Sequence, residues 1–243
     1  MDMFERFREK FSSSEFVPFL NANMEAQAEH ERIKRYNTLY TISTILGIVL
    51  IILLFYWLND SLGFSWSGTY LTWHPMLMVT GMIFLNSQSI LVYRTGRNTP
   101  KFKLKLIHAV IHIVILVLVV LALRPVFNLS GLYSLHSWLG SLTIIIFCCQ
   151  LLVGFTSFLY PSVGKNLKDC ILPYHIVIGY SGFIMALVTA ITGLTGLSSG
   201  STSALPNFIG VILAIFGVLT IHLVTNNDYK REEGSEEDIT LSE

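Results

Sequence analysis

The sequence predicts an all-α membrane protein with six transmembrane helices. Of its 243 residues, 52% are hydrophobic and only 13% are charged, whereas soluble domains carry roughly 25% charged residues. Six charge-free stretches are long enough to cross, as helices, a hydrocarbon core about 30 Å thick. The sequence contains no large basic field of the kind that nucleic-acid binding requires. A nucleic-acid partner is therefore excluded.

The charge-free stretches define each helix in turn. The fifth and sixth share one uncharged stretch, which the Gly-, Ser- and Pro-rich segment 193–207 divides. The six predicted spans, in chain order, are 39–58, 71–93, 104 (or 106)–123, 133–160, 172–195 and 205–225. The predicted domains are a cytosolic N-terminal tail (1–38), a six-helix membrane domain (39–227) and an acidic cytosolic C-terminal tail (228–243).

The basic residues predict the orientation. Arg32, Lys34 and Arg35 precede the first span, after a segment too long for a cleaved leader, so the N-terminus is expected in the cytosol. Six spans then place almost all other basic residues in cytosolic loops, with Arg124 as the exception. Both termini are therefore expected in the cytosol. The glycosylation sequons at Asn59 and Asn128 fall on the outer side.

Four of the seven histidines are expected in the first turn of the second to fifth spans. Ionisable residues inside a bilayer are costly and are candidates for function. Because successive helices enter from opposite faces, His74 and His136 share the outer leaflet, whereas His108 and His175 share the inner one. Imidazole pairs that face each other across a helical bundle suit the axial ligation of low-spin haem iron. Zinc normally takes three or four protein ligands, so two haems are favoured over zinc.

The residues around these histidines resemble the cytochrome b561 family of transmembrane ascorbate-dependent reductases. The similar segments are WHP at 73–75, LVYR at 91–94, KLIHAVIH at 105–112, YSLHSWLG at 133–140, GF at 154–155 and LPYH at 172–175. The resemblance covers about residues 45–230. It implies a central bundle of the second to fifth helices with two b-type haems, which relay electrons from cytosolic ascorbate to an acceptor on the far side.

The resemblance also implies the haem ligands. It makes His74 and His136 the axial ligands of the outer haem, and His108 and His175 those of the inner haem. Tyr133, Ser137 and Trp138 are further candidates that contact the outer haem or its propionates, and Asn86 is a candidate that reaches a haem edge. We interpret His112 as a packing residue near the inner haem, and His30 and His222 as structural.

A cytosolic ascorbate site is implied just before the third and fifth helices. Its candidate residues are Lys101, Lys105, Lys168 and Arg94. Cations beside the haem edge suit a monoanionic enediol. The alternative is that such lysines only enforce topology and bind lipid phosphates, and we favour that alternative for Lys103.

The outer face differs from the family pattern. His108 and His136 are only 28 residues apart, and the loop before His136 lacks the histidine and acidic residues often present there. The expected acceptor is a ferric complex or monodehydroascorbate. Family members are commonly homodimers, and they reside in endolysosomal, secretory-vesicle or plasma membranes. The resemblance implies the same for this chain.

Two other functions share part of this pattern. A non-enzymatic haem-binding membrane protein, or a redox subunit of a larger complex, would keep the four ligands but would not need the donor lysines. A transporter with a histidine proton relay is disfavoured, because broken helices and acidic residues near the midplane are missing from the sequence pattern.

Overall fold

The computed structural model describes residues 13–64, 72–124, 126, 132–160 and 163–230, and all regular structure among them is helical. The elements are α2 (Ser13–Leu62), α3 (Trp73–Met78), η2 (Val79–Leu85), α4 (Asn86–Thr95), α5 (Lys101–Leu123), α6 (Leu135–Gly154), η3 (Phe155–Leu159), α7 (Lys165–Leu197), α8 (Leu205–Thr225) and η4 (Asn227–Tyr229). Six of the described helical segments are long and apolar enough to cross a membrane. The predicted all-α fold with six spans is confirmed.

Three helices begin before the predicted spans. α2 begins at Ser13, α5 at Lys101 and α7 at Lys165, whereas the corresponding predictions start at 39, at 104 or 106, and at 172. Apolar composition marks only the part of a helix that fits a bilayer, and good helix formers such as Glu, Ala, Lys and Arg continue the helix beyond it. Residues 13–38 of the predicted tail are therefore helical. Residues 1–12 and 231–243 of the two predicted tails lie outside the described part of the chain.

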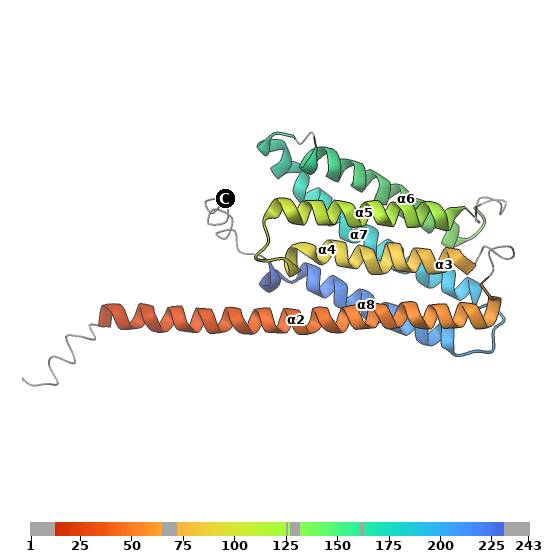
Figure 1. Cartoon of the computed structure of the whole chain (residues 1–243), viewed down its shortest axis with the longest axis horizontal. Helices are drawn as coiled ribbons and strands as arrows, with labels where there is room; N and C mark the ends of the chain where they lie inside the picture. The colour runs from red at the N-terminus through yellow and green to blue at the C-terminus, as the bar shows by residue number, and fades with distance from the viewer. Residues whose placement is uncertain (1–12, 65–71, 125, 127–131, 161–162, 231–243) are drawn as a thin grey trace, which may run out of the picture.

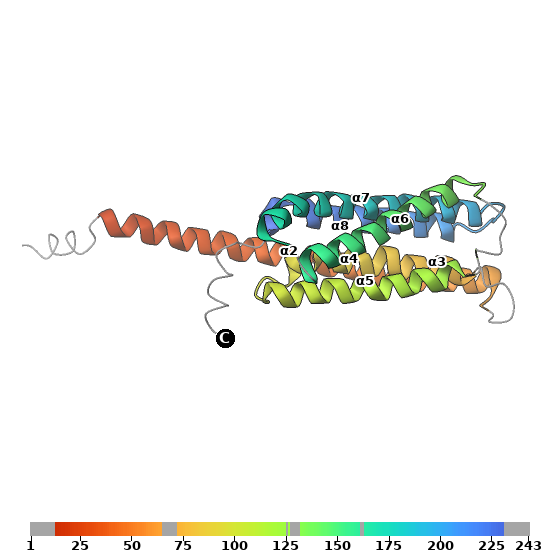
Figure 2. The same cartoon turned by 90° about the horizontal axis from the view of Figure 1, so that it is seen from above.

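Four spans form the central bundle that the family resemblance implies. They are the continuous span of α3, η2 and α4, then α5, then α6 with η3, and finally α7. α5 packs along the first of these spans, α6 packs along α7, and α7 also contacts η2 and α4. α2 and α8 pack against each other beside this bundle, and the first half of α2 runs past its end (Figures 1 and 2).

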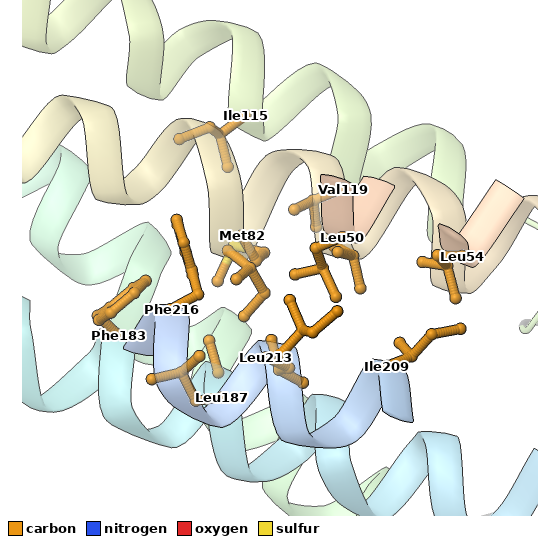
Figure 3. Packing of buried hydrophobic residues seen from close by; sticks show 14 of the residues in the cluster. Leu50, Leu54, Met82, Ile115, Val119, Phe183, Leu187, Ile209, Leu213 and Phe216 are labelled. Atoms are coloured by element: carbon orange, nitrogen blue, oxygen red, sulfur yellow. The ribbon is translucent and has the colours of Figure 1, made fainter. Parts of the chain in front are cut away.

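A buried apolar cluster joins the two flanking helices to the bundle. Phe183 of α7 and Phe216 of α8 are fully buried, and Leu213 and Leu50 pack into the same cluster (Figure 3). Lipid tails are as apolar as these side chains, so close packing between helices, and not exclusion from water, stabilises the arrangement in a membrane. The cluster includes residues of η2, which continues α3, and of α7, so it joins two spans that carry candidate histidines.

Candidate functional site

His74 and His136 face each other at the end of the bundle where α3 and α6 begin. Each is the second residue of its helix, so both lie in the first turn, as predicted. Their ring centroids are 6.0 Å apart. Nδ1 of His74 is 3.0 Å from the carbonyl oxygen of Ala122, and Nδ1 of His136 is 2.9 Å from that of Thr189. Because a carbonyl only accepts, each Nδ1 carries the proton and each Nε2 keeps its lone pair for a metal ion.

His108 and His175 form a second pair toward the other end of the bundle, with ring centroids 6.4 Å apart. The prediction that they lie in the first turn is wrong, because α5 and α7 begin at Lys101 and Lys165, before the apolar part of each helix starts. Nδ1 of His108 is 2.9 Å from the carbonyl oxygen of Ser89 and 3.0 Å from its Oγ. Nδ1 of His175 is buried and has no hydrogen-bond partner among the described residues.

Both separations fit a metal ion held between two imidazoles. Metal–nitrogen bonds of about 2 Å on either side of the ion place the ring centroids roughly 6 Å apart, in agreement with the 6.0 and 6.4 Å of the two pairs. Among the described residues no group of three or more His, Cys, Asp or Glu side chains is placed to hold a metal. A two-imidazole donor set suits haem iron, because the porphyrin supplies the remaining ligands.

A glycine of the neighbouring helix lies against one ring of each pair. A Cβ atom at Gly193 of α7 would be 2.7 Å from Cε1 of His136 of α6, and one at Gly154 of α6 would be 2.9 Å from Cε1 of His175 of α7. The two helices thus exchange roles between the pairs: each contributes a ring at one end of the bundle and a glycine at the other. The π-helical stretch η3 follows Gly154 directly, and such stretches are frequent at functional sites.

His112 lies one turn beyond His108 and packs against it. The ring centroids of these two histidines are 4.4 Å apart, and that of Phe147 is 5.6 Å from His112. Nδ1 of His112 is buried and has no hydrogen-bond partner among the described residues. The ring contacts are those of a packing residue beside the second pair, while its exclusion as a ligand stays a prediction.

The candidate lysines lie on helices and not, as predicted, in loops. Lys101 and Lys105 precede His108 by two turns and one turn of α5, so the three share one face of that helix. Lys168 precedes His175 by two turns of α7 and shares its face in the same way. Lys105 and Lys168 are partly exposed, and Lys101 is exposed. Both helices therefore carry positive charge from their first turns toward the His108–His175 pair.

Arg94 forms hydrogen bonds with the carboxyl end of α8. Its guanidinium donates to the carbonyl oxygens of Asn226 and, at 2.5 Å, of Val224. The last carbonyls of a helix have no partners within the helix and carry partial negative charge. Arg94 thus caps α8, and in a donor site it contributes mainly its positive charge.

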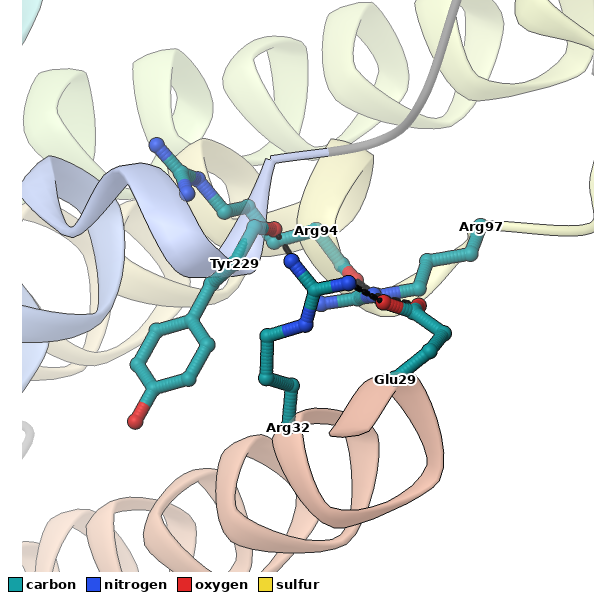
Figure 4. Close-up of polar contacts among 5 residues, drawn as sticks. All are labelled: Glu29, Arg32, Arg94, Arg97 and Tyr229. Carbon is teal, nitrogen blue, oxygen red and sulfur yellow. Dashed lines mark hydrogen bonds and ion pairs between the residues drawn. The ribbon is translucent and has the colours of Figure 1, made fainter. Parts of the chain in front are cut away.

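Arg97 connects the same region to the N-terminal helix. It forms an ion pair with Glu29 of α2 at 3.1 Å and donates to the carbonyl oxygen of Tyr229 at 3.3 Å (Figure 4). Arg32 pairs with the same carboxylate at 2.6 Å. These contacts and those of Arg94 fix α2, the end of α4 and the end of α8 to one another.

The remaining candidates are placed differently from one another. Tyr133 and Trp138 are 89% and 63% exposed near the start of α6. The hydroxyl of Ser137 belongs to a capping box with Ser134, to whose carbonyl oxygen it donates at 2.7 Å. Asn86 is buried, and its Nδ2 donates to the carbonyl oxygen of Met82 at 3.3 Å. The structure does not gather these four residues into one cluster.

Sequence reasoning did not assign Ser89, Gly154 or Gly193 to the site, although all three lie against histidine rings. Gly154 belongs to the GF segment, and a small residue on a helix that faces a candidate ligand is the signal that could have assigned both glycines. Ser89 has a weaker signal, a polar side chain in an apolar span. No sequence signal marks the backbone carbonyls that accept from His74 and His136, because every residue carries a carbonyl.

The fold and the two pairs define a class: an integral membrane protein whose helical bundle offers two sites of two imidazoles each. The chain belongs to the eukaryotic cytochrome b561 family, whose model matches residues 73–199. It is 36% identical over 213 residues to the transmembrane ascorbate-dependent reductase of Homo sapiens. That alignment covers 80% of this chain and 85% of the human protein. It is 34% identical over 212 residues to the lysosomal membrane ascorbate-dependent ferrireductase of Bos taurus, and this alignment covers 77% of the chain and 80% of the bovine protein. Membership confirms the resemblance and implies b-type haem as the cofactor.

Proposed function

We propose that the chain is a transmembrane ascorbate-dependent oxidoreductase. It passes single electrons from cytosolic ascorbate through two b-type haems to an acceptor on the opposite side of the membrane. The observation that carries the proposal is the placement of two imidazole pairs, with centroids 6.0 and 6.4 Å apart, toward opposite ends of one bundle. The activities in the names of the relatives support ascorbate as the donor.

The chain's own residues hold the two groups. His74 and His136 ligate one, and His108 and His175 ligate the other. When bound, haem b supplies a reversible one-electron couple at each pair. Two imidazoles for each haem would suit electron transfer and not oxygen activation. The carbonyls that accept from Nδ1 keep the rings of His74 and His136 oriented for this ligation.

The donor site lies on the side of the His108–His175 pair. Lys101, Lys105 and Lys168 share helix faces with the two histidines, and the amino termini of α5 and α7 add the positive ends of their dipoles. Arg94 adds charge from the end of α4. Together they attract the ascorbate monoanion, which passes one electron to the relay, releases one proton to the cytosolic water and becomes monodehydroascorbate.

Stopped-flow reduction of the purified haem-loaded protein by ascorbate tests the donor site. Lys105→Ala and Lys168→Ala are expected to lower the second-order rate several-fold. The difference from wild type should shrink as salt rises, because salt screens the wild-type field. Lys103→Ala is the matched control, since Lys103 is exposed and lies on another face of α5. Unchanged rates in both test variants would place the donor site elsewhere.

The proposed acceptor is a ferric complex or monodehydroascorbate, and a named ferrireductase among the relatives supports the first. We propose both termini in the cytosol, an endolysosomal, secretory-vesicle or plasma membrane, and a homodimer. Vesicles that contain the protein, with ascorbate on the side of the termini and either acceptor on the other side, measure the preference as the rate of electron delivery. No delivery to either acceptor would contradict transmembrane transfer.

A further inference from the structure

Ser89 of α4 is fully buried and contacts His108 with both of its oxygen atoms. Its carbonyl oxygen is 2.9 Å from Nδ1 of the imidazole, while Oγ is 3.0 Å from that nitrogen and 3.3 Å from the carbonyl oxygen of His108. Tyr93, one turn later on the same face of α4, places its ring centroid 5.7 Å from that of His108. α4 is therefore the helix that fixes this ring.

The distances define where the protons lie when Nε2 of His108 binds iron. Nδ1 then carries the only ring proton, and it donates toward the two oxygens of Ser89. The serine hydroxyl keeps its own proton, which it donates to the carbonyl oxygen of His108. These bonds fix both the tautomer and the rotation of the ring.

The second ligand of the same pair has no comparable support. Nδ1 of His175 is buried without a hydrogen-bond partner among the described residues, and its ring packs on Gly154 and, at 5.4 Å between centroids, on Phe158. In the other pair each Nδ1 has a carbonyl acceptor. The His108–His175 pair is thus the asymmetric one, and its oriented ligand is His108.

We propose that the hydroxyl of Ser89 is a positioning group for His108, which sets the orientation of this imidazole and increases its donor strength toward the haem iron. The inference rests on the proposed haem relay. A partner that accepts from Nδ1–H raises the basicity of the ligand. A more basic ligand stabilises ferric iron and lowers the midpoint potential of that haem. Ser89 therefore tunes the haem that ascorbate reduces.

Electron paramagnetic resonance and redox titration of the purified haem-loaded protein test this role. The test variant is Ser89→Ala, with Ser89→Cys as a near-isosteric second variant and Ser89→Thr as the conservative rescue. Ser87→Ala is the matched control: Ser87 is also fully buried in α4, but its Oγ donates at 2.7 Å to the carbonyl oxygen of Phe84, at the end of the preceding η2. Haem content is measured in every variant.

Ser89→Ala and Ser89→Cys are expected to keep both haems, to shift one low-spin signal and to raise one midpoint potential, while Ser89→Thr and Ser87→Ala match wild type. The proposal is overturned if the signals and potentials of Ser89→Ala and Ser89→Cys equal those of wild type, or if Ser87→Ala gives the same shift. These readouts are independent of the donor. A wild-type protein with both haem signals but no reduction by ascorbate would contradict the proposed function alone.

Discussion

Gly193 lies directly against the ring of His136, so close that a Cβ atom at this glycine would be 2.7 Å from Cε1 of the histidine. Gly193→Ala is therefore expected to displace the ring and to disturb the 6.0 Å separation of the His74–His136 pair. The haem content of the purified protein should fall from two toward one per chain, and the remaining haem should still be reduced by ascorbate, because the His108–His175 pair is untouched.

Gly196→Ala is the control for this variant. Gly196 lies in the same helix three residues later, and a Cβ atom there meets nothing within 4 Å. Pyridine haemochrome assays should find wild-type haem content in Gly196→Ala. If Gly193→Ala also kept both haems, the His136 ring would have moved away from the new methyl group without loss of haem binding, which would contradict the prediction.

Gly154→Ala is expected to produce the complementary defect. Its Cβ atom would be 2.9 Å from Cε1 of His175, so the haem nearer the donor should be lost. Ascorbate should then fail to reduce the remaining haem rapidly, which distinguishes this variant from Gly193→Ala. Gly179→Ala, in α7 and with open space around the new methyl group, should behave as wild type in the same kinetic and haem assays. If Gly154→Ala lost one haem and were still reduced rapidly, the assignment of sides would be wrong.

Much of this arrangement could be predicted from the sequence. Apolar length and the Gly-, Ser- and Pro-rich break between the last two spans predicted the six spans, and the order of entry into the membrane predicted the partners of each histidine pair. The helix starts could not be predicted in this way, because Lys101 and Lys165 extend helices beyond the length that a bilayer selects. The contact of Arg94 with Asn226 joins residues 132 positions apart, and no local sequence pattern predicts it.

Arg94→Ala is expected to destabilise the protein more than it slows the donor reaction. The guanidinium donates two hydrogen bonds to the last carbonyls of α8, and bonds from charged groups contribute about 1.5–3 kcal/mol each. A lower midpoint of thermal unfolding in detergent should result. Arg94→Lys should recover only part of it, because an ammonium lacks the planar fork of the guanidinium. If Arg94→Ala unfolded as wild type yet lost more ascorbate rate than Lys105→Ala, Arg94 would be a direct ascorbate ligand.

His108 and His112 lie one turn apart on nearly the same face of α5, so periodicity alone cannot decide between them as ligands. The contacts favour His108. Its ring centroid is 6.4 Å from that of His175, a separation that fits one metal ion, and its Nδ1 has acceptors on Ser89. Nδ1 of His112 has none among the described residues. His112 also lies one turn farther than His108 from the donor lysines at the start of α5.

His108→Gln is therefore expected to lose one haem and fast reduction by ascorbate. His112→Gln should keep both haems with at most a shifted midpoint potential, because it removes only a ring that packs on His108 and Phe147. The same substitution at adjacent turns of one helix makes each variant the control for the other. Haem content by pyridine haemochrome and stopped-flow reduction are measured for both. Loss of a haem in His112→Gln with full content in His108→Gln would reverse the ligand assignment, and with it the depth of the haem nearer to ascorbate.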